Sequence, residues 1–300
     1  MVGVWLLYTP DTDPDAMHQK YGGELARYVD DGDGGKIHYR DQGPRNAPTL
    51  LLIHGTNASL HTWEGIVPQL AKQYRVISYD QHAHGLTGPH PRDDYSPQAR
   101  IKAAFQVLDA AGVEQAVLIG NSMGGWLTWR ATLANPERVS AMVLLDASGP
   151  IIDVPRKLYL GARLANSSFG QWLMPYVTPR PLITASAQGN YADHSKITDA
   201  LVTRYWELLR YPGNRRGLAM AARTDRQPDY WHRVGEIKQP TLLLWGAQDA
   251  VTPPAYGRAF DKALPNSQLI LYDNAGHLPM EEIPEQVASD LLAWLATQSL

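Results

Sequence analysis

The five residues Gly120–Gly124, Gly-Asn-Ser-Met-Gly, constrain the fold of this chain more than any other stretch. An apolar run, residues 116–119, precedes them, and a helix-like segment, residues 125–131, follows. Glycines two places before and two places after a central residue let a strand pass into a helix through one strained turn. Such a turn presents Ser122 at the end of a sheet and at a helix N-terminus, where developing negative charge is stabilised. The sequence therefore predicts an exposed, reactive serine.

Strand-like and helix-like segments alternate on both sides of this turn. Apolar or alternating runs typical of strands occur at residues 37–40, 49–53, 75–79, 116–119, 142–145, 241–245 and 268–272. Helix-like segments occur at residues 63–73, 96–112, 125–131, 254–264 and 284–296. The pair Ser96-Pro97 is a typical N-cap and first turn. This alternation predicts an α/β fold with a mostly parallel sheet covered by helices on both faces.

The alternation stops near Gly149 and resumes after Gln227. The residues between are rich in helix formers, aromatics and arginines, and their apolar members are Leu158, Leu160, Leu164, Trp172, Leu173, Tyr205, Trp206, Leu208 and Leu209. We interpret residues 149–227 as an inserted helical cap, and the alternative is a set of further helices packed on one side of the sheet. The expected core is then residues 25–148 and 228–300, preceded by an N-terminal arm of residues 1–24.

The arm begins with an apolar stretch, Val2–Leu7, followed by a polar linker at residues 9–15. The stretch is far shorter than the ~20 residues of a membrane span, and it lacks the features of a signal peptide. Two interpretations remain. The stretch is part of an arm that packs on the body or is partly disordered, or it is the remainder of a longer anchor. Peripheral membrane association through the arm therefore stays open. So does the location, which is cytoplasmic or, if an anchor has been lost, membrane-associated or periplasmic.

Charge and cysteine content exclude several kinds of function. The net charge is -3, so the chain has no broad basic field for nucleic acid. There are no cysteines, which excludes disulfides, thiolate metal sites and a cysteine nucleophile. His82, His84 and His90 form a loose cluster with His61 upstream, but no carboxylate stands at a recognisable ligand spacing. We therefore expect no metal site.

Two downstream residues can activate Ser122, whose hydroxyl is a poor nucleophile until a base takes its proton. His277 follows the last predicted strand, and Asp249 follows the strand before it. In a parallel sheet these loops gather at the same carboxyl edge as the serine turn. We therefore expect Ser122, Asp249 and His277 to form a catalytic triad in which the aspartate orients the histidine. Asp146, which ends the strand at 142–145, is the second candidate for the acid.

Acyl transfer also requires hydrogen-bond donors for the oxyanion. The backbone N–H of Met123, directly after the serine, is one candidate. The second should come from the loop after residues 49–53, where Thr56 is our first choice and Asn57 our second. We interpret His54, at the start of this loop, as a structural residue that braces it.

Together these motifs resemble those of the α/β-hydrolase superfamily over roughly residues 25–298. The matching features are His54-Gly55 with Trp63 downstream, Asp80 and Gly85, the serine turn, Asp146, Asp249 and Gly276-His277. Similar proteins often have glycine at the position of Ala83, so this chain departs from the family pattern in that loop. The resemblance implies an eight-stranded, mainly parallel sheet, a cap after the sixth strand and no metal or other cofactor.

The expected function is hydrolysis of carboxylic esters through an acyl-serine intermediate. The apolar cap residues favour small-molecule esters with short- to medium-chain acyl or aromatic groups. Serine at position 122 disfavours the dehalogenases and epoxide hydrolases of the superfamily, which need an aspartate nucleophile. Carbon–carbon bond hydrolases of ring-cleavage products are similar at residues 121–125 and remain an alternative, as do cofactor-free perhydrolases. A binding or adhesion role is the non-enzymatic alternative, and the sequence does not predict the oligomeric state.

Overall fold

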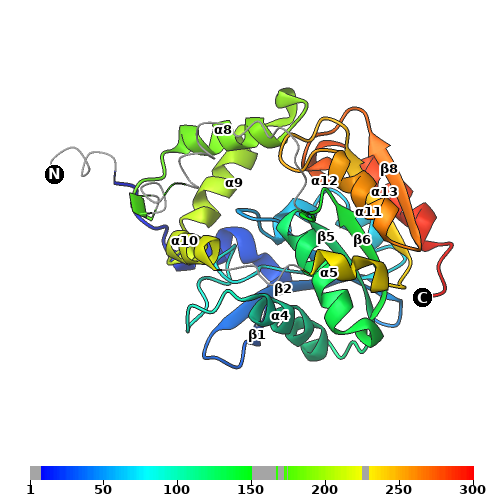
Figure 1. The fold of residues 1–300 in the computed structure, drawn as a ribbon. Helices are drawn as coiled ribbons and strands as arrows, with labels where there is room; N and C mark the ends of the chain where they lie inside the picture. Colours follow the sequence, from blue (N-terminus) through cyan, green and yellow to red (C-terminus); the bar gives the residue numbers. More distant parts are fainter. Residues whose placement is uncertain (1–7, 151–166, 168–171, 174, 225–229) are drawn as a thin grey trace.

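The computed structural model describes residues 8–150, 167, 172–173, 175–224 and 230–300. Its centre is an eight-stranded sheet with the strand order β1-β2-β4-β3-β5-β6-β7-β8 (Figure 1). The strands are β1 (Arg27–Asp30), β2 (Lys36–Gln42), β3 (Thr49–Ile53), β4 (Arg75–Tyr79), β5 (Ala116–Asn121), β6 (Val139–Leu145), β7 (Thr241–Gly246) and β8 (Ser267–Tyr272). Only β2 pairs in antiparallel fashion, with β1 and β4, and the other pairs are parallel. The predicted mostly parallel sheet is therefore confirmed.

Helices cover both faces of this sheet because alternate strand residues point to opposite sides. Leu51 and Ile53 of β3 pack in one apolar cluster with α4 (Pro97–Ala110), α5 (Met123–Ala134) and α11 (Ala255–Ala263). Leu50 and Leu52 pack in a second cluster with α3 (Val67–Leu70) and α13 (Pro284–Leu295). The strands that carry both sets read as continuous apolar runs, as expected for a sheet buried on both faces.

Two predicted helices show how far local sequence signals reach. Helix α4 begins at Pro97, and the Ser96 side chain accepts a hydrogen bond from the N–H of Ala99, as the N-cap prediction requires. The helix predicted at residues 63–73 is wrong in length. The structure has a 3₁₀ turn, η3 (Leu60–Trp63), and then the four-residue α3. Gly65 separates the two segments, and a side chain there would lie 2.8 Å from Pro284.

Among the described residues between β6 and β7 are the helices α8 (Arg180–Asn190), α9 (Asp199–Leu209) and α10 (Asn214–Arg223), and Figure 1 shows them grouped together to one side of the sheet. The Asn214 side chain bonds the backbone oxygen of Gly85, in the loop after β4, so α10 contacts the carboxyl edge of the sheet. The division into arm, core and cap remains a prediction. Residues 151–166, with Leu158, Leu160 and Leu164, lie outside the described residues.

The described part of the N-terminal arm packs on these helices. Backbone N–H groups of Thr9 and Thr12 donate to the oxygens of Tyr176 and Arg210, each at 2.9 Å. The short helix α2 (Pro14–Met17) and a π-helical turn (His18–Gly22) follow. The apolar stretch at residues 2–7 lies outside the described residues. None of the helices formed by the described residues is long and apolar enough to span a bilayer.

Candidate active site

Ser122 occupies a strained turn between β5 and α5. Its backbone angles are φ 54° and ψ -118°, a conformation that non-glycine residues rarely adopt. The turn is fixed on the neighbouring strand, since the N–H of Ser122 donates to the oxygen of Leu145 and its oxygen accepts from the N–H of Ser148. A side chain at Gly124 would lie 2.0 Å from the oxygen of Ile53, so glycine is required there. A strained conformation held by this many contacts is typical of functional sites.

Ser122 is also the accessible member of its segment. It is half-buried, whereas every other residue from 116 to 132 is buried. Its side chain makes no capping hydrogen bond to α5, so the hydroxyl is not tied to the start of the helix. The helix α5 starts at the next residue, which places the positive end of its dipole beside the hydroxyl.

The loops after β7 and β8 bring Asp249 and His277 together. The distance between His277 Nδ1 and Asp249 Oδ2 is 2.8 Å. Asp249 also accepts the N–H groups of Val251 and Thr252 and, at 2.7 Å, the Thr252 hydroxyl. Burial opposes the charge of Asp249, but His277 and these donors outweigh it and hold the pKa of the carboxyl below its ordinary value. The ionised Asp249 then accepts Nδ1–H, which leaves the Nε2 lone pair of His277 free.

The histidine loop is attached to the serine turn through Asn121. The Asn121 amide donates to the oxygens of His277 and Leu145, at 3.1 and 3.2 Å. Asn121 directly precedes Ser122, so this contact sets the His277 backbone next to the turn that carries the serine. The sequence alone predicts no contact for Asn121. The clue that was available is an amide in a strand end flanked by glycine and serine.

Asp146, the second candidate for the acid, lies beside the same pair. Polar atoms of Asp146, Asp249 and His277 lie within 4.8 Å of one another. His277 nevertheless hydrogen-bonds Asp249, whereas Asp146 Oδ1 accepts the N–H of Gly246 at 2.9 Å. The geometry thus favours Asp249 as the acid that orients His277.

The two residues expected to supply oxyanion donors meet next to Ser122. The Thr56 hydroxyl contacts the Met123 sulfur at 3.4 Å, and a side chain at Gly55 would lie 3.0 Å from the Ser122 Cβ. In the described part of the chain the backbone N–H groups of Thr56 and Met123 have no acceptor. Both groups are therefore available to an oxyanion bound at Ser122.

His54 contacts the backbone on both sides of its loop. Its Nδ1–H donates to the oxygen of Gly55 at 2.7 Å, and its Nε2 accepts the N–H of Gln81 at 3.1 Å. The Gln81 amide donates back to the oxygen of His54. Nearby, Ala83 has φ 67°, the left-handed conformation that glycine adopts at lower cost. The loop thus keeps a glycine-like shape despite the alanine.

The histidine cluster predicted from sequence is only partly assembled. His82 Nε2 lies 3.1 Å from Asp31 Oδ2, and His90 Nε2 lies 3.3 Å from Asp33 Oδ2. His84 instead packs against His54, and His61 bonds the backbone of Tyr21, so these two lie apart from the pair. Carboxylates accompany these histidines in space, although none stands at a recognisable ligand spacing in the sequence. The carboxylates come from the turn between β1 and β2, which has no fixed sequence spacing from the β4 loop.

The tautomer of His90 decides what this cluster can bind. His90 Nδ1 accepts the N–H groups of Arg92 and Asp94, at 3.2 and 3.3 Å. An acceptor at Nδ1 places the proton of a neutral ring on Nε2, where it donates to Asp33. Burial lowers the pKa of His82 to about 4, so the His82 ring is neutral at pH 7. The pairs therefore act as hydrogen bonds that join two loops, and His90 offers no lone pair to a metal at Nε2.

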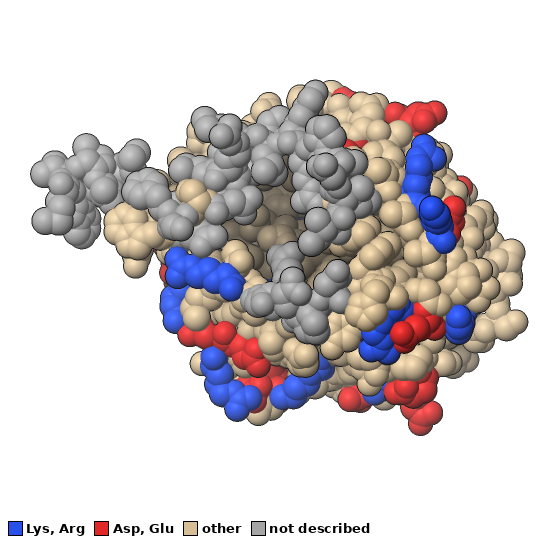
Figure 2. Space-filling model, viewed as in Figure 1, with Lys and Arg blue, Asp and Glu red and all other residues tan. Residues whose placement is uncertain are grey.

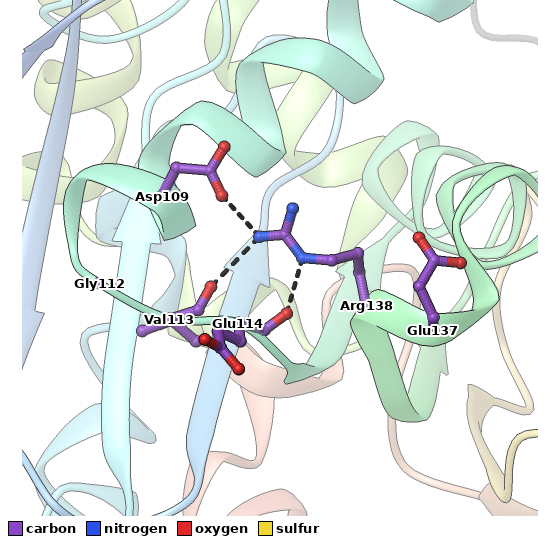
Figure 3. Close-up of a pocket in the computed structure, with 6 residues that line it drawn as sticks. All are labelled: Asp109, Gly112, Val113, Glu114, Glu137 and Arg138. Carbon is purple, nitrogen blue, oxygen red and sulfur yellow. Dashed lines mark hydrogen bonds and ion pairs between the residues drawn. The ribbon is translucent and has the colours of Figure 1, made fainter.

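Two hollows can be compared on the part of the surface that the structure describes. Figure 2 shows one whose visible floor carries no Lys, Arg, Asp or Glu. The other, of about 610 Å³, lies before β5 and β6 and surrounds Arg138 (Figure 3). The Arg138 guanidinium bonds the Asp109 carboxylate and the backbone oxygens of Val113 and Glu114. Its charge is thus already satisfied, and this hollow lies at the opposite end of β5 from Ser122.

The sequence profile of the alpha/beta hydrolase fold family matches residues 48–284. The chain therefore belongs to the α/β-hydrolase fold family, and it is a hydrolase. An uncharacterised hydrolase of Bacillus subtilis, YugF, is 26% identical over 271 residues, covering 86% of this chain and 94% of YugF. The 2-hydroxy-6-oxononadienedioate/2-hydroxy-6-oxononatrienedioate hydrolase of Paraburkholderia phymatum is 29% identical over 282 residues, covering 90% and 95%.

Solved structures agree with this family and fold. A hydrolase of Pseudomonas aeruginosa PA01 has a TM-score of 0.77 and 25% identity, covering 91% of this chain and 99% of that one. A bacterial membrane phospholipase A has a TM-score of 0.79 and 23% identity, covering 94% and 90%. The second likeness is one of fold alone.

Proposed function

We propose that this protein hydrolyses carboxylic esters through an acyl-Ser122 intermediate. His277 Nε2 takes the proton of the Ser122 hydroxyl as Oγ attacks the ester carbonyl carbon. The N–H groups of Met123 and Thr56 stabilise the oxyanion. His277 then gives its proton to the departing alcohol, and later accepts a proton from the water that releases the acid.

The observation that carries this proposal is the Asp249–His277 hydrogen bond of 2.8 Å. It lies in the loop that Asn121 attaches to the strained serine turn. A histidine whose Nδ1–H is held by a buried carboxylate has its basic nitrogen fixed at Nε2. A serine nucleophile requires a histidine whose basic nitrogen is fixed in this way. A histidine loop with a purely structural role would not need a fixed basic nitrogen beside an accessible, strained serine.

The charges around the hollow favour an uncharged substrate. Four arginines of the described cap helices are paired with carboxylates, in the pairs Arg180–Asp199, Arg204–Glu64, Arg215–Asp11 and Arg216–Asp93. A cation already paired is a poor partner for a substrate carboxylate. Together with the uncharged floor in Figure 2, this supports neutral esters with short- to medium-chain acyl or aromatic groups.

Carbon–carbon bond hydrolysis is the second candidate. Several relatives at 26–29% identity are hydrolases of 2-hydroxy-6-oxononadienedioate, a dicarboxylate by name. The Asn121-Ser122-Met123 sequence resembles such enzymes as well. A dicarboxylate would need unpaired cations near Ser122, and the pairing of the described cap arginines makes it the second choice. Perhydrolysis would be a side reaction in which peroxide replaces water at the same acyl-enzyme.

One experiment ranks these functions. Wild type and Ser122→Ala are compared on p-nitrophenyl esters of graded acyl length and on a ring-cleavage-product substrate. We expect ester turnover by the wild type and a loss of at least about 10³-fold in kcat for the variant. A higher kcat/KM for the ring-cleavage product would establish the second candidate. Wild type as inert as Ser122→Ala on every substrate would instead support a binding protein.

A further inference from the structure

The carboxyl group of Asp146 is fully buried beside the Asp249–His277 pair without bonding to the histidine. It follows β6, in a left-handed conformation with φ 43°. Its Oδ1 accepts the N–H of Gly246 at 2.9 Å, whereas its Oδ2 has no hydrogen-bond donor among the described residues. Asp146 and Asp249 therefore place two carboxyl groups in one water-poor site.

Two such groups cannot both be ionised, because a second negative charge there is neither hydrated nor paired. Asp249 has four donors, namely the N–H groups of Val251 and Thr252, the Thr252 hydroxyl and His277. Asp146 has one, a backbone N–H on Oδ1. The negative charge therefore belongs on Asp249 and the proton on Asp146, where Oδ2 is the oxygen left free to carry it.

We propose that Asp146 is a neutral carboxylic acid whose Oδ2–H donates to the Asp249 carboxylate, which makes Asp146 a positioning residue for the catalytic acid. The inference rests on the function proposed for Ser122, Asp249 and His277. A neutral donor satisfies a further lone pair of Asp249 and fixes its rotation, and it adds no second charge beside the histidine.

The other ionisable groups around Asp146 favour the same state. Tyr272 on β8 and Glu282 on α12 (Pro279–Glu282) interact with it, and Asp249 and His277 complete its surroundings. Burial, followed by the Asp249 carboxylate, raises the pKa of Asp146 well above its ordinary value. Among the described groups just named, His277 is the basic side chain, and its Nδ1–H is bonded to Asp249.

A first experiment detects the proton without any substrate. A carboxyl with a raised pKa in the folded state makes folding take up a proton, so stability falls as pH rises above the unfolded pKa of about 3.9. Asp146→Asn keeps the shape and lacks that proton. Urea titrations between pH 5 and 8 give the unfolding equilibrium constants of the wild type and of Asp146→Asn. We expect the wild-type constant divided by the variant constant to rise by up to about tenfold per pH unit. A ratio that does not change with pH would overturn the proposal.

A second experiment tests positioning through kinetics. When Asp249→Asn removes the neighbouring charge, Asp146 can ionise and orient His277 in its place. Asp249→Asn should then retain activity that the double variant Asp249→Asn/Asp146→Asn loses by at least about tenfold. In the wild-type background, Asp146→Asn should lower activity far less than it does in the Asp249→Asn background, because the asparagine amide still donates to Asp249.

The two experiments separate the failure of this inference from the failure of the proposed function. If Asp146→Asn lowers activity equally in both backgrounds, Asp146 has a merely structural role and the proposal is contradicted. If the wild type hydrolyses no ester, the proposed function fails, whereas the pH dependence of unfolding still decides whether Asp146 carries the proton.

Discussion

The backbone N–H of His277 donates to the backbone oxygen of Asn190, at the end of α8, over 2.7 Å. Glu282 reinforces this joint, since its carboxylate accepts the N–H of Gly276 at 2.6 Å and that of Ala192 at 2.8 Å. The loop that carries the proposed base is thus bonded directly to the helices between β6 and β7. A change in those helices will therefore alter the position of His277 as well as the shape of the substrate site.

Glu282→Ala should lower both stability and turnover. The carboxylate is 2% exposed, and its loss leaves the N–H groups of Gly276, Ala192 and Asp193 without an acceptor. Gly276 is buried whereas Ala192 and Asp193 are in part exposed, so the Gly276 N–H carries the main cost of a buried unsatisfied donor, about 1–3 kcal/mol. We therefore expect a loss of about 2 kcal/mol in urea unfolding and about tenfold in kcat. Glu285→Ala, at an exposed position of α13, is the control and should change neither quantity. Equal effects of the two variants would contradict the role of Glu282.

Thr252→Val should reduce activity while the shape of the side chain is kept. The Thr252 hydroxyl lies 2.7 Å from Asp249 Oδ2 and 2.9 Å from the backbone oxygen of Asp146. Hydrogen bonds to charged groups contribute about 1.5–3 kcal/mol, which corresponds to about a tenfold or larger fall in kcat/KM if Asp249 loses its orientation. Thr252→Ser keeps the hydroxyl and should restore most of this loss in ester assays. Valine and serine variants of equal activity would show that the hydroxyl is dispensable.

Gly124→Ala should disrupt the serine turn. The new Cβ would lie 2.0 Å from the backbone oxygen of Ile53, so α5 or β3 must move. Overpacking of this kind costs about 1–3 kcal/mol or more, and we expect a lowered Tm together with loss of ester turnover. Gly235→Ala is the matched control, because its Cβ would meet only the oxygen of Ala263 at 3.4 Å. A Gly124→Ala protein with the wild-type Tm would mean that the turn tolerates the displacement.

Asp80 should make stability depend on acid pH. Burial opposes its charge, but the hydrogen bond and charge of His38 outweigh burial and hold the pKa of Asp80 below its ordinary value. A lowered folded-state pKa stabilises the fold above the unfolded pKa of about 3.9, and this stabilisation is lost as pH falls. Asp80→Asn should cost about 3 kcal/mol at pH 7 and progressively less below about pH 4, as followed by circular dichroism.

Chelation should leave activity and stability unchanged. His90 uses Nδ1 as an acceptor for two backbone N–H groups, so its Nε2 carries a proton toward Asp33 and has no lone pair for a metal. We expect dialysis against EDTA to change neither the Tm nor ester turnover, and isothermal titration with zinc to give no heat from this cluster. A lowered Tm that zinc restores would show that Asp31, His82 and His90 do bind a metal.

The local sequence determined the elements whose signals lie within a few residues. Apolar runs predicted seven of the strands, and Ser96-Pro97 predicted the start of α4. The spacing of glycines around Ser122 predicted the turn, and the resemblance to a known family predicted the eight-stranded sheet that is observed. The strand β1 was missed because its residues, Arg-Tyr-Val-Asp, are largely exposed and contain no apolar run.

Only the tertiary structure decided which side chains meet at the edge of the sheet. Because β6 lies beside β7 in the sheet, Asp146 and Asp249 share one buried site although they are far apart in sequence. The turn between β1 and β2 likewise brings Asp31 to His82. Such contacts depend on the order of the strands and on the paths of the loops. Hydrophobic periodicity and turn signals in the sequence indicate only the backbone conformation within one element. The sequence thus determined the serine, its turn and the order of its expected partners along the chain. The packing of strands determined how their charges and protons are shared.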